Sequence, residues 1–171
     1  MLRISKLTDY AVVLTTWLAG RALSERHNVR DLAAVTGIHQ PTVGKILKHL
    51  ARHGIVESHR GARGGYRLAA SPAKIPVAAV IEALEGPIAV TECASDETSG
   101  ACEYEGRCEV QANWRQINDV LSRALASVSL ADMARPASPV RELVQLGRGA
   151  DGTAAEAMDA QPARAPTPSQ S

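Results

Sequence analysis

Apolar residues recur every three or four positions in several stretches of the chain, and this spacing predicts helices. The first stretch covers residues 5–23, the second runs from Asn28 to Gly37, and the third runs from Pro41 to Gly54. Asn28 is a good N-cap, Gly37 suits a left-handed C-terminal residue, and a proline fits the first turn of a helix. Two helices joined by a glycine-containing turn indicate a helix-turn-helix, although an ordinary αα-hairpin fits the same pattern.

A short β-hairpin is expected after the third helix. Residues 55–60 alternate weakly between apolar and polar, residues 61–65 form a turn that needs positive φ, and residues 66–68 return as a strand. Between His39 and Arg67 the only acid is Glu57, whereas the Lys and Arg residues are Lys45, Lys48, Arg52, Arg60, Arg63 and Arg67. Clustering of one charge sign on a helix and a hairpin favours nucleic-acid binding over an ordinary solvated surface.

Two further helices are expected, at residues 76–86 and at about residues 111–127, followed by one capped turn at residues 129–133. The longer helix carries an apolar stripe made of Trp114, Ile117, Leu121, Ala124, Leu125 and Val128. A second copy of the chain would cover this stripe; the alternative is a helix folded back on its own domain. The expected fold class is therefore mainly α with a small β-wing: a winged helix-turn-helix domain followed by a long C-terminal dimerisation helix.

The domain organisation expected from these patterns has three parts. Residues 1–86 form the DNA-binding domain, and residues 87–135 form a cysteine-containing loop and the dimerisation helix. Residues 136–171 form a mostly disordered tail, because the chain from Gly147 onward is rich in Ala, Gly, Pro and Ser.

Aromatic residues make up only 3% of the chain and Phe is absent, so the core must use Leu, Val, Ile and Ala, which favours helices. No run approaches the ~20 apolar residues of a membrane span, and no signal peptide opens the chain, so we expect a cytoplasmic protein.

The three cysteines of the chain, Cys93, Cys102 and Cys108, all lie in the acidic segment 91–109 with the spacing C-x8-C-x5-C. In a reducing compartment such a group favours metal binding or redox chemistry over structural disulfides. Zinc-type C-x2-4-C pairs and ferredoxin spacings are absent, and three thiolates are one short of an all-cysteine site. A cluster with one other ligand fits, drawn from Glu92, Glu109, Gln111 or a partner subunit; a thiol–disulfide switch and plain free thiols are the alternatives.

The DNA-reading side chains should lie at the start of the third helix, where a recognition helix meets base edges in the major groove. The candidates are His39, Gln40, Thr42 and Lys45; Gln suits adenine, and Lys suits the acceptors of guanine. Arg60 and Arg63 flank the wing turn, where contact with phosphates or the minor groove fits. Gly44 is costly inside a helix by about 1 kcal/mol, which indicates either close approach of DNA or a packing constraint.

Several of these residues together resemble the IscR/NsrR family. The matching stretches are 7–11, LTDYA; 37–38, GI; 58–66, SHRGARGGY; and three cysteines ahead of a Trp-bearing helix. The resemblance covers about residues 1–133. It implies a dimeric bacterial winged-helix regulator that binds an iron–sulfur cluster. The stretches 1–10, 84–87 and 91–93 look closest to the branch that regulates SUF iron–sulfur assembly operons.

The resemblance implies that Cys93, Cys102 and Cys108 are the cluster ligands, although the first gap is x8 where x5 is usual. Some members of the family place a His where this chain has Gln111, and others use an acid in the first helix of the partner subunit, which would match Asp9. The cofactor implied is an iron–sulfur cluster, 2Fe-2S with 4Fe-4S as the alternative.

The function expected is a homodimeric, DNA-binding transcriptional regulator, not an enzyme, with double-stranded operator DNA as its partner and no small-molecule substrate. A cluster-free, thiol-redox-sensing regulator of the same fold is the alternative. An iron–sulfur carrier or redox enzyme belongs to another class, and it lacks support because the chain has no nucleotide loop, no CxxC and no Ser/His/Asp constellation.

Overall fold

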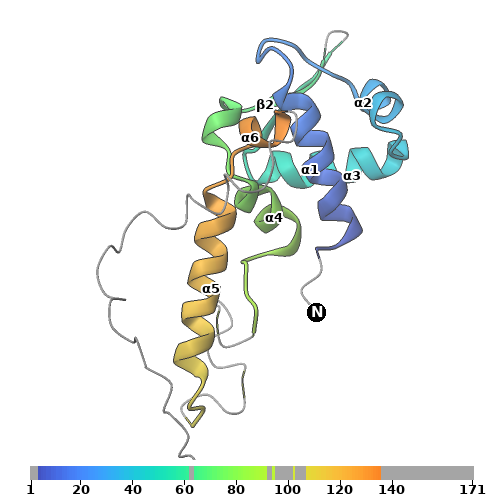
Figure 1. The fold of residues 1–171 in the computed structure, drawn as a ribbon. Coiled ribbons are helices and arrows are strands. Elements are labelled where there is room, and N and C mark those ends of the chain that lie inside the picture. The colour runs from blue at the N-terminus through green and yellow to red at the C-terminus, as the bar shows by residue number, and fades with distance from the viewer. Residues whose placement is uncertain (1–3, 62–63, 92–93, 95–101, 103–106, 136–171) are drawn as a thin grey trace, which may run out of the picture.

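The computed structural model describes residues 4–61, 64–91, 94, 102 and 107–135 (Figure 1). The elements in chain order are α1 Lys6–Ala19, α2 Val29–Thr36, α3 Gln40–Arg52, β1 Val56–His59, β2 Gly65–Leu68, the 3-10 helix η1 Pro72–Lys74, α4 Val77–Glu85, α5 Gln111–Ala126 and α6 Leu130–Ala134. The described chain is thus mainly helical with a two-stranded antiparallel sheet, as the sequence predicted. The predicted tail, residues 136–171, lies outside the described residues.

The helix ends follow the capping residues found in the sequence. Ser5 caps α1 by accepting a hydrogen bond from the Thr8 N–H at 3.3 Å, and Asn28 caps α2 by accepting one from Asp31 at 2.9 Å. Gly37 ends α2 in the left-handed conformation with φ of 70°. The first helix ends at Ala19 rather than near residue 23, because the Gly20 N–H bonds the Trp17 carbonyl at 3.3 Å and closes the last turn.

Helices α1 to α4 and the two-stranded wing pack into one unit, which we call the head. Its core lies where α1, α3 and α4 meet. α1 contacts α2, α3, α4, α6 and β2, and α3 contacts α2, α4 and β1. The fully buried aliphatic side chains there come from five helices: Leu14, Leu32, Val43, Ile46, Leu47, Leu50, Val80 and Leu130. All of them are Leu, Ile or Val, as expected for a chain without Phe. All but Leu130, which lies at the start of α6, occupy positions that helical periodicity predicted to be apolar.

The wing is a hairpin held to the rest of the head at its second strand. β1 and β2 pair from Val56 with Leu68 to His59 with Gly65. Tyr66 also exchanges two backbone hydrogen bonds with His27, at 2.9 and 2.8 Å, which adds the α1–α2 connection to the sheet edge. A Cβ at Gly65 would lie 2.9 Å from the His27 backbone, so only glycine allows this approach.

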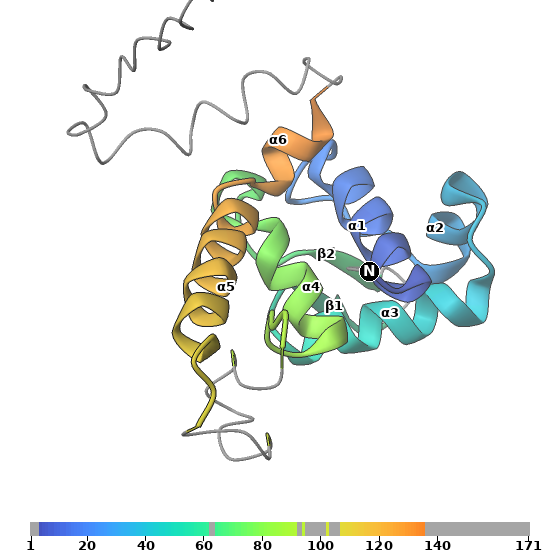
Figure 2. The ribbon, with the colours of Figure 1, turned by 60° about the horizontal axis from the view of Figure 1, so that its bottom comes forward.

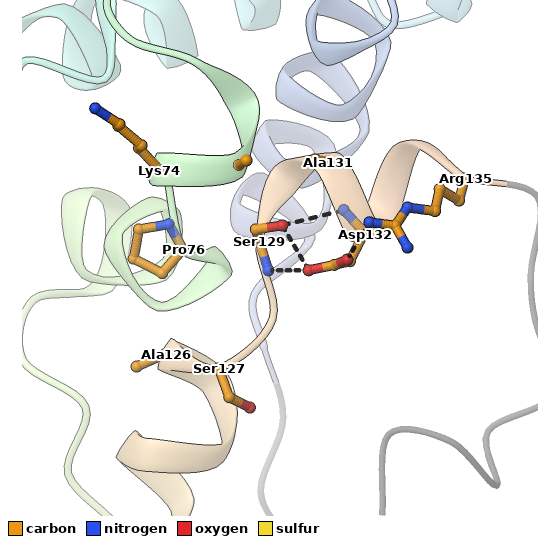
Figure 3. Close-up of a pocket in the computed structure, with 9 residues that line it drawn as sticks. Lys74, Pro76, Ala126, Ser127, Ser129, Ala131, Asp132 and Arg135 are labelled. Atoms are coloured by element: carbon orange, nitrogen blue, oxygen red, sulfur yellow. Dashed lines mark hydrogen bonds and ion pairs between the residues drawn. The ribbon is translucent and has the colours of Figure 1, made fainter. Parts of the chain in front are cut away.

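The chain returns to the head after α5 through a short antiparallel pairing, which we call the Pro76–Ser129 bridge. The Val77 N–H donates to the Val128 carbonyl at 2.8 Å, and the Leu130 N–H donates to the Ile75 carbonyl at 2.9 Å. Leu130 has no exposed surface, and α6 packs on α1 and η1. The predicted capped turn is present, because Ser129 and Asp132 form a reciprocal capping box (Figure 3).

The apolar stripe of α5 has two parts that face different surroundings. α5 runs beside α4 and extends away from the rest of the head (Figures 1 and 2). Near its C-terminal end, Leu125 and Val128 pack against the core of the same chain. Nearer its N-terminal end, large apolar side chains are exposed: Val110, Trp114, Ile117 and Val120. The helix therefore both folds back on its own domain and presents an uncovered apolar face.

Within the part of the chain that the structure describes, no helix combines the length and apolarity needed to cross a membrane.

Candidate nucleic-acid interface and cysteine segment

The recognition helix of the helix-turn-helix is α3. Its buried side consists of Val43, Ile46, Leu47 and Leu50, so the polar residues between them lie on the outward side. His39, the N-cap residue, is exposed, as are Gln40 and Lys45, while Thr42 is half-buried. Lys48 and Arg52 continue the exposed basic row along the same helix. The outward face of α3 therefore carries the four predicted base-reading side chains beside positive charge that no acidic residue of α3 itself offsets.

Gly44 lies within α3, and the structure shows room around it. A Cβ at this position would meet Val29 Cγ1 at 3.9 Å, which is an ordinary van der Waals contact. The described residues therefore give no packing reason for a glycine inside this helix.

The two described arginines of the wing have different surroundings. Arg60 follows β1 and is exposed. Arg67 lies directly across the sheet from Glu57 and donates to its carboxylate from Nε at 3.0 Å and Nη2 at 2.7 Å. Its Nη1 also donates to the Leu23 carbonyl at 3.2 Å, so Arg67 ties the wing to the α1–α2 connection. Arg63 lies outside the described residues.

The Arg67 guanidinium changes the titration of its partner. Its hydrogen bonds and its positive charge hold the pKa of Glu57 below the ordinary value, with a smaller contribution from His59, whose Nε2 lies 3.4 Å from the same carboxylate. Arg67 is thus committed to an ion pair within the wing. This geometry fits a surface residue of the strand better than a contact with DNA.

The cysteine segment joins α4 to α5. Cys102 and Cys108 are free thiols, and both are half-buried. The Cys108 carbonyl accepts a hydrogen bond from the N–H of Gln111, the first residue of α5, at 3.3 Å. Cys93 lies outside the described residues. Of the residues near it, Ala94 donates its N–H to the Thr91 carbonyl at 3.0 Å.

Asn118 in the middle of α5 contacts this segment, and sequence reasoning missed it. Its Oδ1 accepts a hydrogen bond from the Val90 N–H at 3.1 Å, and its Nδ2 donates to the Ala94 carbonyl at 3.4 Å. It is the buried residue of α5, at 8% exposure. The sequence did hold one indication of this contact: Asn118 is a polar residue within the apolar stripe formed by positions 114, 117, 121 and 125.

The helix that precedes the cysteine segment, α4, ends beside the start of α1. Glu85, the last residue of α4, accepts hydrogen bonds from the Ser5 N–H at 3.1 Å and the Thr8 hydroxyl at 2.5 Å. Bonds from Ser5 and Thr8 hold the pKa of Glu85 below its ordinary value. Asp9, the suggested fourth ligand, is exposed in the first turn of α1, next to this joint.

The described residues do not by themselves bring a complete ligand set together. Among them, no three His, Cys, Asp or Glu side chains lie close enough to hold one metal ion. A cavity of about 530 Å³ lies elsewhere, between η1, the end of α5 and α6; its lining includes Lys74 and the paired residues Asp132 and Arg135 (Figure 3). The described residues of its lining do not belong to the cysteine segment.

A helix-turn-helix with a β-hairpin wing and a basic outward face on α3 defines a winged-helix DNA-binding protein. Comparison with known proteins gives the family. Residues 4–136 match the Rrf2 family, described as iron-dependent transcriptional regulators, and the chain belongs to this family. The expected resemblance to IscR and NsrR regulators is thereby confirmed at the level of the family.

Individual relatives agree with this assignment. The chain is 28% identical to the HTH-type transcriptional regulator NsrR of Geobacillus kaustophilus, over 86% of this chain and 100% of the relative. It is 29% identical to the HTH-type transcriptional regulator IscR of Photorhabdus laumondii, over 77% of this chain and 79% of the relative. Among solved structures, it resembles CymR, the global cysteine regulator of B. subtilis, with a TM-score of 0.63 and 27% identity over 78% of this chain and 97% of that chain. These names confirm a transcriptional regulator rather than an enzyme.

The ion pair of the wing predicts how stability depends on pH. The pKa of Glu57 is lowered on folding from its ordinary value of 4.5, so the pair contributes stability above that value and loses it as pH falls through the lower folded pKa. In urea denaturation from about pH 6 to about pH 3, the stability advantage of the wild type over Glu57→Gln should shrink as pH falls. Glu82→Gln, on exposed α4 surface outside the wing, is the control. A difference between wild type and Glu57→Gln that stays constant across this range would contradict the prediction.

Proposed function

We propose that this chain is a dimeric transcriptional regulator whose binding to operator DNA responds to an iron–sulfur cluster held by Cys93, Cys102 and Cys108. The observation that carries the proposal is the location of the cysteine segment. It joins α4, which is part of the DNA-binding head, to α5, which carries the uncovered apolar face. The description of the family as iron-dependent regulators supports the proposal.

The thiols of the cysteine segment are suitable ligands for an iron–sulfur cluster. Cys102 and Cys108 are unpaired and half-buried, and thiolates are the usual ligands of iron–sulfur clusters. When bound, the cluster would supply a centre that reacts to the redox state or iron supply of the cell. We propose a 2Fe-2S cluster, with 4Fe-4S as the alternative, and Asp9 of a partner subunit as the fourth ligand. The exposure of Asp9 leaves it available to a second copy.

A cluster-free regulator that senses thiol oxidation is the second candidate. The free state of Cys102 and Cys108, and the structural likeness to the cysteine regulator CymR, favour it. The two candidates share the DNA-binding head and differ in whether the thiols hold iron or form a disulfide.

Dimerisation is proposed through α5. Val110, the N-cap residue of α5, is 50% exposed. Trp114, Ile117 and Val120 follow it at helical spacing and are 36%, 49% and 59% exposed. An exposed apolar patch of this kind marks an interaction surface. A second copy is the proposed occupant, because a two-fold dimer places two recognition helices on successive turns of DNA.

Operator reading is proposed for the outward face of α3. His39, Gln40, Thr42 and Lys45 would reach base edges, while Arg60 and Arg63 of the wing would contact phosphates or the minor groove. Gly44 fits this proposal, since a helix position without a side chain would let the backbone come close to DNA. The proposed target is a SUF-type iron–sulfur assembly operon, which places the protein in the cytoplasm.

Substitutions at a base-reading residue and at a phosphate-contacting residue should have different effects on DNA binding. Lys45→Ala should cost about 1–3 kcal/mol on the preferred operator and relax the preference at one base pair. Arg60→Ala should weaken binding to every duplex and reduce the slope of log K against log salt by about 0.9. Arg123→Ala, which removes the same charge from α5, is the control. Fluorescence anisotropy over a salt series measures both effects; an Arg60→Ala slope equal to that of the wild type would exclude Arg60 from the interface.

The cluster should depend on each cysteine. After anaerobic reconstitution with iron and sulfide, wild-type protein should show visible absorption, and Cys93→Ser, Cys102→Ser and Cys108→Ser should lose it while their far-ultraviolet circular dichroism stays unchanged. Asp9→Ala should shift the spectrum if a partner's carboxylate completes the site. A colourless wild type would reject the cluster, and mass spectrometry of oxidised protein would then test for the disulfide of the second candidate.

Oligomeric state tests the face of α5. Ile117→Glu combined with Val120→Glu should give monomers, because two buried carboxylates would oppose association, and should weaken operator binding. Ala112→Glu places a carboxylate on an exposed position of the same helix and is the control. Analytical ultracentrifugation distinguishes the variants; a double variant that remains dimeric would mean that the interface lies elsewhere.

A further inference from the structure

Asn118 is a buried amide at a position where helical periodicity calls for an apolar side chain. Trp114 lies four residues before it, and Leu121 and Leu125 lie three and seven residues after it, so Asn118 interrupts their stripe. Burial of an amide costs free energy unless its donor and acceptor are both bonded. A residue that carries this cost on a helix of otherwise exposed or half-buried side chains has a specific contact to make.

That contact is with the backbone on both sides of Cys93. Asn118 accepts from the Val90 N–H at 3.1 Å and donates to the Ala94 carbonyl at 3.4 Å, so one side chain bonds both ends of the segment 90–94. Within the same segment, the Ala94 N–H also donates to the Thr91 carbonyl at 3.0 Å. The two partners also fix the orientation of the amide, because Val90 offers a donor and Ala94 an acceptor.

The same helix holds the other end of the cysteine segment. Cys108 lies three residues before Gln111, the first residue of α5, and its carbonyl is bonded to that residue. Asn118 is seven residues further on, which is about 10 Å along a helix that rises 1.5 Å per residue. Both ends of the loop that carries the three thiols are therefore attached to one rigid element. Such attachment lowers the conformational entropy lost when the loop closes around a ligand.

We propose that Asn118 is a positioning residue for the cluster: it holds Val90 and Ala94, between which Cys93 lies in the sequence, against α5, so that both ends of the cysteine segment start from one rigid helix. The inference rests on the proposed cluster-binding function, which it deepens by naming the residue that prepares the site. Asn118 touches no ligand itself. It acts through the backbone of segment 90–94, and its effect should be visible before any cluster is bound.

Two variants separate the two hydrogen bonds. Asn118→Ala removes both. Asn118→Asp keeps an acceptor for the Val90 N–H but places a carboxylate oxygen opposite the Ala94 carbonyl, which removes the second bond and adds repulsion. Gln116→Ala is the matched control, because it also removes an amide from α5, at an exposed position about 200° around the helix axis.

The first measurement uses the full-length protein without a cluster. Amide hydrogen exchange at Val90 should be about five- to tenfold faster in Asn118→Ala, the factor expected for the loss of the one hydrogen bond of this N–H, and close to wild type in Asn118→Asp and Gln116→Ala. The rate at which an alkylating reagent modifies Cys93 should change in both Asn118 variants and stay unchanged in the control. Thermal unfolding followed by circular dichroism confirms that each variant is folded.

The second measurement uses the reconstituted protein. Release of the cluster to an iron chelator, followed by visible absorption, should be several-fold faster in Asn118→Ala and Asn118→Asp than in Gln116→Ala and wild type. Wild-type rates of exchange and release in a folded Asn118→Ala would overturn the inference. Faster exchange with an unchanged release rate would also overturn it, because the contact would then play no part in holding the cluster. A wild type that takes up no cluster would instead reject the proposed function, and the exchange rate would still report whether Asn118 holds the segment.

Discussion

The Pro76–Ser129 bridge is the constraint on which the arrangement of the molecule depends. Two backbone hydrogen bonds, of 2.8 and 2.9 Å, and the complete burial of Leu130 bring the chain after α5 back onto the head. Burial of one leucine side chain contributes about 1.5–3 kcal/mol, a large share of the stability of a small domain. α4 contacts both α3 and α5, so the recognition helix and the helix with the uncovered apolar face belong to one packed unit.

The cysteine segment is attached to this unit at separate places. Before the segment begins, Glu85 at the end of α4 accepts hydrogen bonds from Ser5 and Thr8 at the beginning of α1. Further along, Asn118 bonds the backbone around Cys93, and Cys108 leads directly into α5. Any change in the order of this segment therefore acts on helices that meet the DNA-binding core and on the helix proposed to join two copies. A ligand shifts such an equilibrium only by the difference in its affinity for the two arrangements, typically 1–3 kcal/mol.

The sequence predicted those parts of the structure that depend on local chemistry. Asn28, Gly37 and the Ser129–Asp132 pair mark helix ends because capping is decided by a few neighbouring residues. Periodicity also identified the apolar side of α5, but it could not say what covers each part. Leu125 and Val128 pack on the head of the same chain, whereas Trp114 and Ile117 are exposed. Contacts between distant positions, such as Glu85 with Thr8 and Asn118 with Val90, follow from tertiary packing and leave only a weak trace in the sequence.

The Pro76–Ser129 bridge also bears on the length of DNA that a dimer would accept. In a dimer joined through α5, the described chain offers no linker between the joining helix and α3, since both are packed through α4 and tied again by the bridge. Insertion of one base pair between two half-sites moves the second by about 3.4 Å and rotates it by roughly 34° around the DNA axis, since one helical turn spans about 34–36 Å and 10–10.5 base pairs. A protein without a hinge cannot follow that rotation except by deforming the DNA. In such a dimer, rigid attachment of the head would make the distance between half-sites, as well as their sequence, a determinant of which operators are bound.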